Sequence, residues 1–261
     1  MILDEQSLYQ HDLEQTGANR ERLQRNKNLM FWYQELYRDL FSSVPGLEHK
    51  RVLEIGSGAS PLKNFIPMVI TSDVLKLEHL DFVFDCHDIA DFTEIADHSI
   101  DIITLTNVLH HLKDPIQFLR DARSKLVNGG HVYIVEPYFS FLSYPIFKLF
   151  HHEPVNFSIA RPILDKVHGP LSTSNQAIPH MIFFSRADWL NELTDYYILD
   201  ESCYGFFTSL AYMVTGGISR IIPVPKWIYR PYFVLDRLLA RHLPKIFASF
   251  FSVRLVAKGS S

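Results

Sequence analysis

The feature that most constrains the fold is a series of five short apolar runs, rich in β-branched residues, in the first half of the chain. They cover residues 52–55, 68–72, 82–85, 100–105 and 131–136. Continuous runs of this length are typical of strands that are buried on both faces of a parallel sheet. Between the last two runs, Asp114 and Pro115 predict the start of a helix, and Gly129-Gly130 predicts its end. Strands that alternate with helices predict a doubly wound α/β sheet.

The flanking segments predict how this sheet is completed. Residues 19–43 have the period of one amphipathic helix, which Pro45-Gly46 would end. Beyond Pro137 the alternation breaks, and further strand candidates occur at 196–204 and 249–258. Because the last of these is needed to complete the sheet, we expect one domain with two insertions after the fifth strand.

The composition is that of a globular protein with an uneven distribution of charge. The 261 residues are 47% hydrophobic and 21% charged, which excludes global disorder, and two cysteines are too few for a disulfide framework. The net charge is −4, but residues 206–258 carry eight basic side chains and one acidic side chain, a net charge of +7. The rest of the chain therefore carries −11. A basic, aromatic region of this kind suggests an anionic partner.

A glycine turn directly follows the first apolar run, within residues 52–60. Gly56 and Gly58 lack a Cβ, so the backbone can turn tightly there and approach a ligand closely. Such a ligand would lie at the carboxyl end of the first strand, where open α/β sheets bind cofactors. A dinucleotide-binding turn would need a third glycine near the position of Pro61. The turn therefore argues against NAD or FAD.

Carboxylates follow the glycine turn at the next two strand ends. Asp73 follows the second run, where it can accept hydrogen bonds from both hydroxyls of a ribose. Asp88 follows the third run, where it can accept from an adenine amino group, and Glu54 can accept from a charged amine. Together they describe a nucleoside site without a pyrophosphate. Each aspartate could equally be a solvated turn residue or a helix cap.

Five motifs occur in a fixed order along the chain. They are EIGSG (54–58), SDV (72–74), CHDI (86–89), NVLHHLKDP (107–115) and LVNGGHVYIVEP (126–137). In these motifs the chain resembles the class I S-adenosylmethionine-dependent methyltransferases of the type 11 family. The resemblance implies a Rossmann-like, seven-stranded doubly wound sheet with an antiparallel terminal hairpin, an N-terminal helix and insertions after strand five. It also implies S-adenosylmethionine as the cofactor.

The resemblance implies a role for each cofactor-binding position. Gly56 and Gly58 would pass close under the methionine part of the cofactor, with Glu54 near its amine. Asp73 would bind the ribose, and Asp88 with Ile89 the adenine. Thr106 and Asn107 would line the methionine side, although Asn107 could equally cap a helix at 108–113. The complete implied set is Glu54, Gly56, Ser57, Gly58, Asp73, Val74, Asp88, Ile89, Thr106 and Asn107.

The expected single domain spans residues 1–261 and has four parts. A helical cap covers 1–48, and the cofactor-binding core covers 49–137. Two insertions, 138–184 and 205–248, would cap the substrate.

Four histidines are candidates for a general base, which assists methyl transfer when the acceptor is a hydroxyl. His110 and His111 follow Asn107 by three and four positions, so one of them can point toward the cofactor, although both could equally be packing residues. His151 and His152 begin the HHEP stretch of the first insertion, which fits an active-site lid and resembles a subfamily motif. Their spacing is poor for a metal site and no further cluster completes one, so we expect no metal.

The basic region at 205–248 has three interpretations: a cap over the substrate pocket, a membrane-surface patch, or a nucleic-acid-binding surface. Nucleic acid is the least favoured partner, because no RNA-binding module is recognisable and the body of the chain is acidic. A membrane-surface patch suggests a hydrophobic or lipid-linked acceptor, for example a glycan or quinone-like precursor.

The sequence therefore predicts an S-adenosylmethionine-dependent methyltransferase that acts on a small or amphipathic acceptor, with oxygen as the favoured atom. The alternatives are a nucleic-acid or protein methyltransferase, and a binding or assembly protein that keeps the fold without turnover. We expect a cytoplasmic location with peripheral membrane association through 205–248. The first residues are acidic and polar, unlike a secretory signal, and the sequence has no run of about 18 apolar residues.

Overall fold

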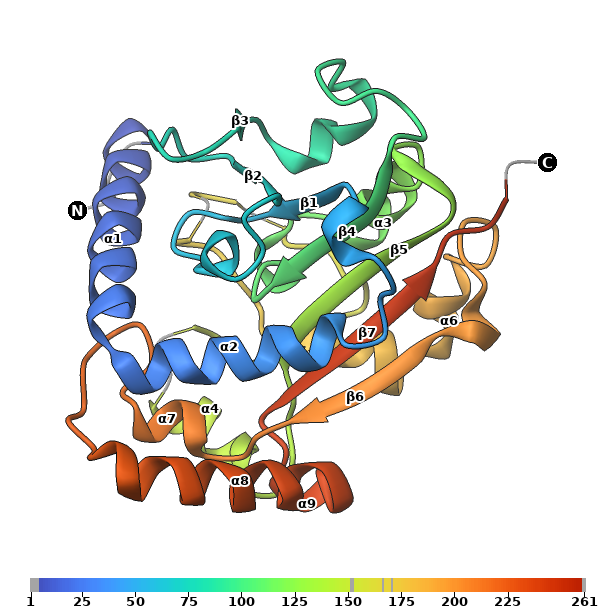
Figure 1. Ribbon diagram of the computed structural model, residues 1–261. Helices are drawn as coiled ribbons and strands as arrows, with labels where there is room; N and C mark the ends of the chain where they lie inside the picture. The colour runs from blue at the N-terminus through green and yellow to red at the C-terminus, as the bar shows by residue number, and fades with distance from the viewer. Residues whose placement is uncertain (1–4, 151–152, 166, 170, 260–261) are drawn as a thin grey trace.

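The computed structural model describes residues 5–150, 153–165, 167–169 and 171–259. Its seven strands are β1 (Val52–Ile55), β2 (Ile70–Asp73), β3 (Phe82–Val83), β4 (Ile100–Thr106), β5 (Leu126–Pro137), β6 (Cys203–Phe207) and β7 (Phe250–Val256). They form one sheet with the order β3-β2-β1-β4-β5-β7-β6 (Figure 1). β1 to β5 are parallel, and β7 is antiparallel to both β5 and β6. This sheet confirms the predicted architecture, including the antiparallel terminal hairpin.

Helices cover both faces of the sheet and its carboxyl edge. They are α1 (Glu5–Arg25), α2 (Lys27–Phe41), α3 (Pro115–Ala122), α4 (Ser143–Phe150), α5 (Ala177–His180), α6 (Ala187–Asn191), α7 (Ala211–Val214), α8 (Lys226–His242) and α9 (Pro244–Phe247). Shorter helical turns are η1 (Leu47–His49), η2 (Leu62–Asn64), η3 (Cys86–Asp91), η4 (Leu109–His111), η5 (Met181–Ser185) and η6 (Leu199–Glu201). Only the short turn η2, of three residues, follows the glycine turn before β2.

The expected helix over 19–43 is two helices, and this part of the prediction was wrong. Asn26 separates α1 from α2 with an extended ψ of 91°. Its side chain accepts a hydrogen bond from the Leu29 N–H at 3.2 Å and donates one to the Thr215 carbonyl at 2.9 Å. The first bond caps α2. The second crosses the molecule to the last insertion, so the local helical period could not reveal the break.

The glycine pair at 129–130 does not end α3, contrary to the prediction. α3 ends at Ala122, and β5 already begins at Leu126, which pairs with Ile100 of β4. Gly129-Gly130 therefore lies inside β5. The strand starts early because β4 supplies its main-chain partners, after a register shift between Ile100 and Ile102.

The sixth strand begins later than the predicted range 196–204. Tyr197 makes only an isolated bridge to Ala257, and the turn η6 interrupts the chain before Cys203. From Cys203 onward the chain pairs continuously with β7.

Two apolar clusters pack on opposite faces of the sheet, because successive strand residues point to opposite sides. One cluster joins α3 and residues 177–197 to Leu53, Ile103 and Ile134. The other joins α2, α7 and α8 to Val52, Ile102 and Tyr133. Figure 1 shows α7 between α2 and α8. The insertion between β6 and β7 is therefore part of a helical layer on the sheet.

Trp32 is the central side chain of that second layer. It is 0% exposed, and its Nε1 donates a hydrogen bond to the Thr208 hydroxyl at 2.9 Å. Its ring meets Phe207, Tyr212 and Phe250 edge-on, with centroids 5.0–5.3 Å apart. The indole thus joins α2 to β6, α7 and β7.

A bilayer-spanning helix is absent from the part of the chain that the structure describes.

We predict that Trp32→Ala lowers the free energy of unfolding by about 3–5 kcal/mol, because it leaves a large cavity and an unpaired Thr208 hydroxyl. Urea unfolding followed by circular dichroism measures the change. Trp227→Ala is the matched control, because Trp227 is 77% exposed and its loss should change the free energy by less than about 0.5 kcal/mol. Equal losses in the two variants would contradict this account of the core.

Candidate cofactor and active site

The glycine turn lies at the carboxyl end of β1, packed between the loop after β4 and helix α1. Gly56 has φ +76°, and a Cβ at this position would lie 2.3 Å from Cγ2 of Val108. A Cβ on Gly58 would lie 2.7 Å from Cγ2 of Thr16 and 2.9 Å from Oδ2 of Asp73. Real side chains do not tolerate such distances. The turn therefore requires glycine at both positions.

Glu54 ends in a buried, half-satisfied carboxylate directly below this turn. Its side chain is 2% exposed, and Oε1 accepts a hydrogen bond from the Ser60 hydroxyl at 2.5 Å. Oε2 is buried without a hydrogen-bond partner among the described residues. Burial raises the pKa of Glu54 to about 7, against the opposing effect of the bonds from Ser60 and Ser57. A buried carboxylate oxygen without a donor fits a site for a cationic amine.

Asp73 ends β2 beside the glycine turn, as the sequence predicts. Its Oδ2 accepts the Gly58 N–H at 2.9 Å, and its Oδ1 accepts the Leu75 N–H at 3.0 Å. Burial raises the pKa of Asp73 above its usual value, and these backbone donors oppose the rise. Val74 follows it and is half-buried. The ribose-binding role of Asp73 stays a prediction.

Ser57 and the end of β2 fix the shape of the turn through a closed set of hydrogen bonds. The Ser57 hydroxyl donates to the Glu54 carbonyl at 3.2 Å and accepts from the Ser72 N–H at 3.1 Å. The Ser72 hydroxyl donates to the same carbonyl at 2.8 Å. Ser57 therefore stabilises the turn through hydrogen bonds to main-chain groups of β1 and β2.

Asp88 and Ile89 lie in η3, after β3. Ile89 is fully buried in the apolar cluster under the sheet, whereas Asp88 is exposed. The side chain that caps η3 is Asp85, which accepts the His87 N–H at 3.0 Å. Asp85, and not Asp88, therefore caps this helical turn. The adenine-binding role of Asp88 stays a prediction.

Thr106 and Asn107 lie at the end of β4 and face the same region. Asn107 has φ +56°, and its N–H donates to the Val135 carbonyl of β5 at 2.8 Å. It does not cap a helix, contrary to the alternative reading, because η4 begins after Val108 and has no side-chain cap. Its Oδ1 is buried without a partner among the described residues. The Thr106 hydroxyl hydrogen-bonds to Tyr37 of α2.

His110 is held between two glutamates. Its Nδ1 lies 2.5 Å from Oε2 of Glu136, and its Nε2 lies 3.1 Å from Oε2 of Glu153. Burial opposes the charged form of His110, but the two carboxylates prevail and raise its pKa to about 10. An imidazole with both nitrogens facing carboxylates has no site for a substrate proton. This geometry disfavours His110 as a general base.

The other three candidate bases have different settings. His111 is half-buried, its Nδ1 lies 3.0 Å from the Thr173 carbonyl, and its Nε2 lies 3.7 Å from Oε1 of Glu153. His151 and His152 lie outside the described residues. The catalytic role of these histidines stays a prediction.

The sequence reasoning missed Glu136 and Glu153 as members of this site. Glu136 is 0% exposed, and its Oε1 accepts the N–H groups of Val108 and Leu109 at 3.0 and 2.6 Å. The sequence feature that could have identified Glu136 is its position as the acidic residue that ends the apolar run at 131–136. Glu153 belongs to the HHEP stretch, but the fold alone brings it to His110.

Helix α1 and the first insertion close over the glycine turn. Asp12 of α1 accepts hydrogen bonds from the Leu171 N–H at 3.0 Å and from the Ser172 hydroxyl at 2.9 Å. Thr16, one turn further along α1, lies next to Gly58, and its hydroxyl is buried without a partner among the described residues. The N-terminal helix and the first insertion thus cover the site together.

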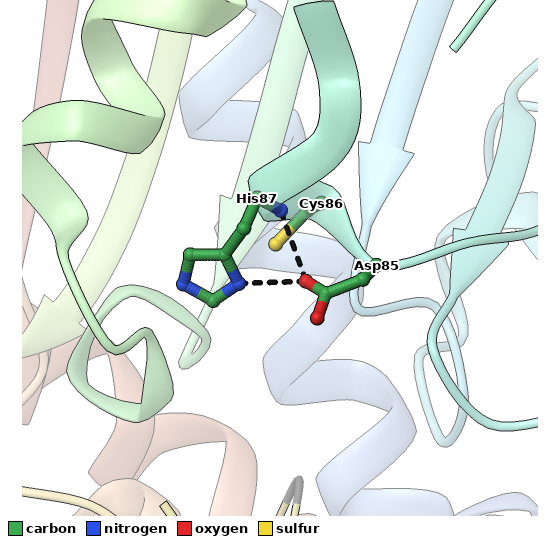
Figure 2. Close-up of side chains that lie close together, drawn as sticks. All are labelled: Asp85, Cys86 and His87. Atoms are coloured by element: carbon green, nitrogen blue, oxygen red, sulfur yellow. Dashed lines mark hydrogen bonds and ion pairs between the residues drawn. The ribbon is translucent and has the colours of Figure 1, made fainter. Parts of the chain in front are cut away.

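Asp85, Cys86 and His87 are residue types that can bind metal, and they lie together after β3. The side chains of Asp85 and His87 already hold hydrogen bonds. Figure 2 shows the His87 imidazole and the Asp85 carboxylate joined by a hydrogen bond of 2.6 Å. The Nε2 of His87 accepts the Lys113 N–H at 3.1 Å. Burial also raises the pKa of the Cys86 thiol, so this sulfur stays protonated. Cys203, in contrast, is exposed.

A family model described as a methyltransferase domain matches residues 31–196, more than half of the chain. The chain belongs to this methyltransferase family. The matched segment contains the glycine turn, β1 to β5 and the first insertion. It confirms the resemblance stated from the motifs, and with it S-adenosylmethionine as the cofactor of the class.

Solved structures of low sequence identity resemble this methyltransferase over most of its length. One is a SAM-dependent methyltransferase from Archaeoglobus fulgidus, with 16% identity, 85% of this chain and 94% of that chain covered, and a TM-score of 0.48. Another is the N-methyltransferase NodS from Bradyrhizobium japonicum in complex with S-adenosyl-L-homocysteine, with 14% identity, 91% of each chain covered and a TM-score of 0.43. A search of curated proteins found no match.

The cofactor fits the residues at the carboxyl ends of β1, β2 and β4. Two glycines leave room for close approach, and Glu54 and Asn107 each present a buried oxygen that has no partner in the described part of the chain. These are the features expected where a ligand supplies the missing hydrogen-bond donors.

We predict that Gly56→Ala weakens binding of S-adenosylhomocysteine at least about tenfold, a loss of about 1.4 kcal/mol, because the new Cβ displaces Val108. Gly129→Ala is the matched control. Gly129 also has a positive φ, +71°, but nothing lies within 4 Å of its Cβ position. Isothermal titration calorimetry should find unchanged affinity in the control, and a similar loss in both variants would contradict the steric argument.

Binding of S-adenosylhomocysteine should also depend on pH through Glu54. The ligand's ammonium needs the ionised carboxylate, and the pKa of Glu54 is raised to about 7, so acidification below that value neutralises the group. We predict an affinity about tenfold lower near pH 6 than near pH 8, as expected for uptake of one proton. In Glu54→Gln the affinity should be low at both pH values. A wild-type profile as flat as that of the variant would exclude this role of Glu54.

Proposed function

We propose that this methyltransferase transfers a methyl group to an oxygen atom of an amphipathic acceptor that it meets at a membrane surface. The observation that carries the proposal is a stripe of exposed apolar side chains on α8, on the face opposite to the one packed in the core. The acceptor class and the acceptor atom are both part of the proposal.

The cofactor-binding part of the proposal uses the residues already described. Glu54 would bind the amine, Asp73 the ribose, and Asn107 the methionine side of the site. When bound, S-adenosylmethionine supplies a methyl group on a positively charged sulfur, which is an efficient leaving group. The protein then has to orient the acceptor and exclude water.

An aromatic cluster at the carboxyl end of β5 offers an apolar site for the acceptor. Four rings surround His180 at centroid distances of 5.0–5.7 Å: Tyr138, Phe139, Phe157 and Phe184. Burial lowers the pKa of His180 to about 4, so the imidazole is neutral at neutral pH. Its Nδ1 is buried without a partner among the described residues. A neutral imidazole nitrogen in an aromatic site suits an acceptor with a hydroxyl and an apolar body.

The exposed stripe on α8 repeats at helical spacing. Its largest members are Trp227, 77% exposed, and Val234, Leu235 and Leu238, each more than half exposed. The opposite face of α8 is buried through Tyr229, Phe233 and Ala240. One apolar face of α8 is buried in the protein, and the other is exposed to water. Insertion of the exposed face into a lipid surface would remove these side chains from water.

Neighbouring segments extend this apolar surface. Leu243, between α8 and α9, and Ile246 of α9 are also exposed. The N–H groups of Phe141 and Leu142 donate to the carbonyls of Lys245 and Ile246, at 2.9 and 3.0 Å. Phe141 is 84% exposed, so the start of the first insertion lies beside α9 and presents its ring to solvent.

Two arginines near the stripe form ion pairs with α2, whereas the Arg230 guanidinium lies 3.6 Å from the centre of the Phe31 ring. Arg237 contacts Glu35 at 3.1 Å and Asp39 at 3.7 Å, and Arg241 pairs with Asp39. These two arginines are used inside the protein. Lys226 and Arg230 instead line a cavity of about 340 Å³ together with Lys27, next to Trp227. This basic cavity beside an apolar stripe is complementary to an anionic lipid headgroup.

We predict that labelled methyl groups from S-adenosylmethionine enter the lipid-extractable fraction of a cell extract. We also predict that the protein sediments with phosphatidylglycerol vesicles at low salt. The double variant Trp227→Ser/Leu235→Ser should weaken vesicle binding by more than about tenfold, because each apolar side chain contributes about 1.5–3 kcal/mol when buried.

Met68→Ser is the matched control, because Met68 is an exposed apolar residue outside α8, in the loop before β2. Its vesicle binding should equal that of the wild type. Label in the nucleic-acid or protein fraction would favour the corresponding alternative acceptor. Binding of S-adenosylhomocysteine without any turnover would favour a binding protein that keeps the fold.

A further inference from the structure

Three metal-ligating side chains from two distant segments converge at the edge of the methyl-transfer site. His110 and His111 come from η4, directly after β4, and Glu153 comes from the first insertion. Oε2 of Glu153 lies 3.1 Å from Nε2 of His110, and Oε1 lies 3.7 Å from Nε2 of His111. The ligand atoms of all three residues lie within 4.8 Å of one another.

In both histidines Nδ1, the ring nitrogen that does not face Glu153, has a protein partner that orients the ring. Nδ1 of His110 lies 2.5 Å from the buried Glu136 carboxylate, and Nδ1 of His111 lies 3.0 Å from the Thr173 carbonyl. Both Nε2 atoms are thereby directed toward Glu153. A carboxylate or a carbonyl on the outer nitrogen is the arrangement that fixes the tautomer of metal-bound histidines.

We infer that His110, His111 and Glu153 form a binding site for a divalent transition-metal ion, with Zn²⁺ as the reference ion. Ligand atoms bound at about 2.0–2.2 Å to one tetrahedral ion lie roughly 3.3–3.6 Å apart, which the two observed distances bracket. Two imidazoles and one carboxylate are also the ligand set of catalytic zinc sites that leave a further position for water or substrate. No charge imbalance opposes the ion, since the site includes two carboxylates, Glu153 and Glu136.

Binding of the ion replaces one direct contact by three metal–ligand bonds. The lone pair on Nε2 of His110 binds the ion, and the proton that Nε2 shares with Glu153 leaves to solvent. Oε2 of Glu153 also accepts a hydrogen bond from the Gln176 amide at 2.7 Å. Glu153 therefore binds the ion through Oε1 and keeps this bond, while Glu136 keeps its bond to Nδ1 of His110.

The site adjoins the cofactor turn through one residue. Val108 touches the position of a Gly56 Cβ and donates its N–H to Glu136 at 3.0 Å. An ion at this place would face the methyl-transfer region, where its open position could bind and acidify an acceptor hydroxyl. This would supply the activation that His110, with both nitrogens engaged, does not offer as a free base.

The group Asp85, Cys86 and His87 provides an internal comparison. Here Nε2 of His87 already accepts a backbone N–H and Nδ1 bonds to Asp85 (Figure 2). An ion would have to displace a main-chain hydrogen bond. His87→Ala is therefore the matched control for removal of a histidine from a cluster in which one imidazole nitrogen already accepts a main-chain N–H.

The test is a metal titration of the whole protein. After treatment with a chelator, the wild type should bind one Zn²⁺ per chain in equilibrium dialysis with elemental analysis. Co²⁺ in its place should give visible absorption bands of a low-symmetry site. His111→Ala and Glu153→Gln should each weaken binding by at least about tenfold, while His87→Ala should bind as the wild type does.

Thermal melting and binding of S-adenosylhomocysteine report on the fold of each variant independently. Glu153→Gln keeps the size of the side chain, so it distinguishes a lost ligand from a lost fold. If the folded wild type binds neither Zn²⁺, Mn²⁺ nor Fe²⁺ stoichiometrically, or if His87→Ala weakens binding as much as His111→Ala, the metal site is excluded. Binding of S-adenosylhomocysteine in that case would leave the methyltransferase function intact.

Discussion

The position of the loop after β4, beside the candidate active site, depends on one buried carboxylate. Glu136 is at the end of β5, 0% exposed, and it bonds to the N–H groups of Val108 and Leu109 and to the His110 ring. These bonds tie the loop after β4 to β5 and set the direction of His110. A charge buried in this way is stable only while its partners stay in place, and removal of one partner typically costs about 3–5 kcal/mol. The position of η4, and through it the contact with Glu153, follows from this requirement.

The glycine turn depends on the same loop from the other side. Val108 lies where a Cβ on Gly56 would be, so the turn and the η4 loop fit only because Gly56 has none. Helix α1 closes the opposite side through Thr16 and reaches the first insertion through Asp12. The cofactor-binding core, the N-terminal cap and the first insertion thus meet at one point, although they are far apart in the sequence.

The basic region acquires a different meaning once its partners are known. Part of its charge neutralises Glu35 and Asp39 of α2, which fixes α8 on the helical layer over the sheet. Its apolar residues divide between a buried face around Phe233 and an exposed face around Trp227. The net charge of +7 therefore overstates the attraction for an anionic partner, and the exposed apolar stripe becomes the more informative feature.

The sequence by itself determined where the first five strands lie along the chain and where the glycine turn follows the first of them. Both are local properties: a run such as 52–55 is apolar over the length of a buried strand, and Gly56 and Gly58 follow it at once. Asp73 could be placed beside the turn for the same reason, because parallel strands end at one edge of the sheet.

Only the tertiary structure decided the features that rest on partners far along the chain. The break at Asn26 needs the Thr215 carbonyl, and the early start of β5 needs β4 as its partner. Glu153 of the HHEP stretch contacts His110, which lies more than forty residues earlier in the sequence. A helical or strand period reports burial, but the contact between Glu153 and His110 depends on how the first insertion folds back over the sheet.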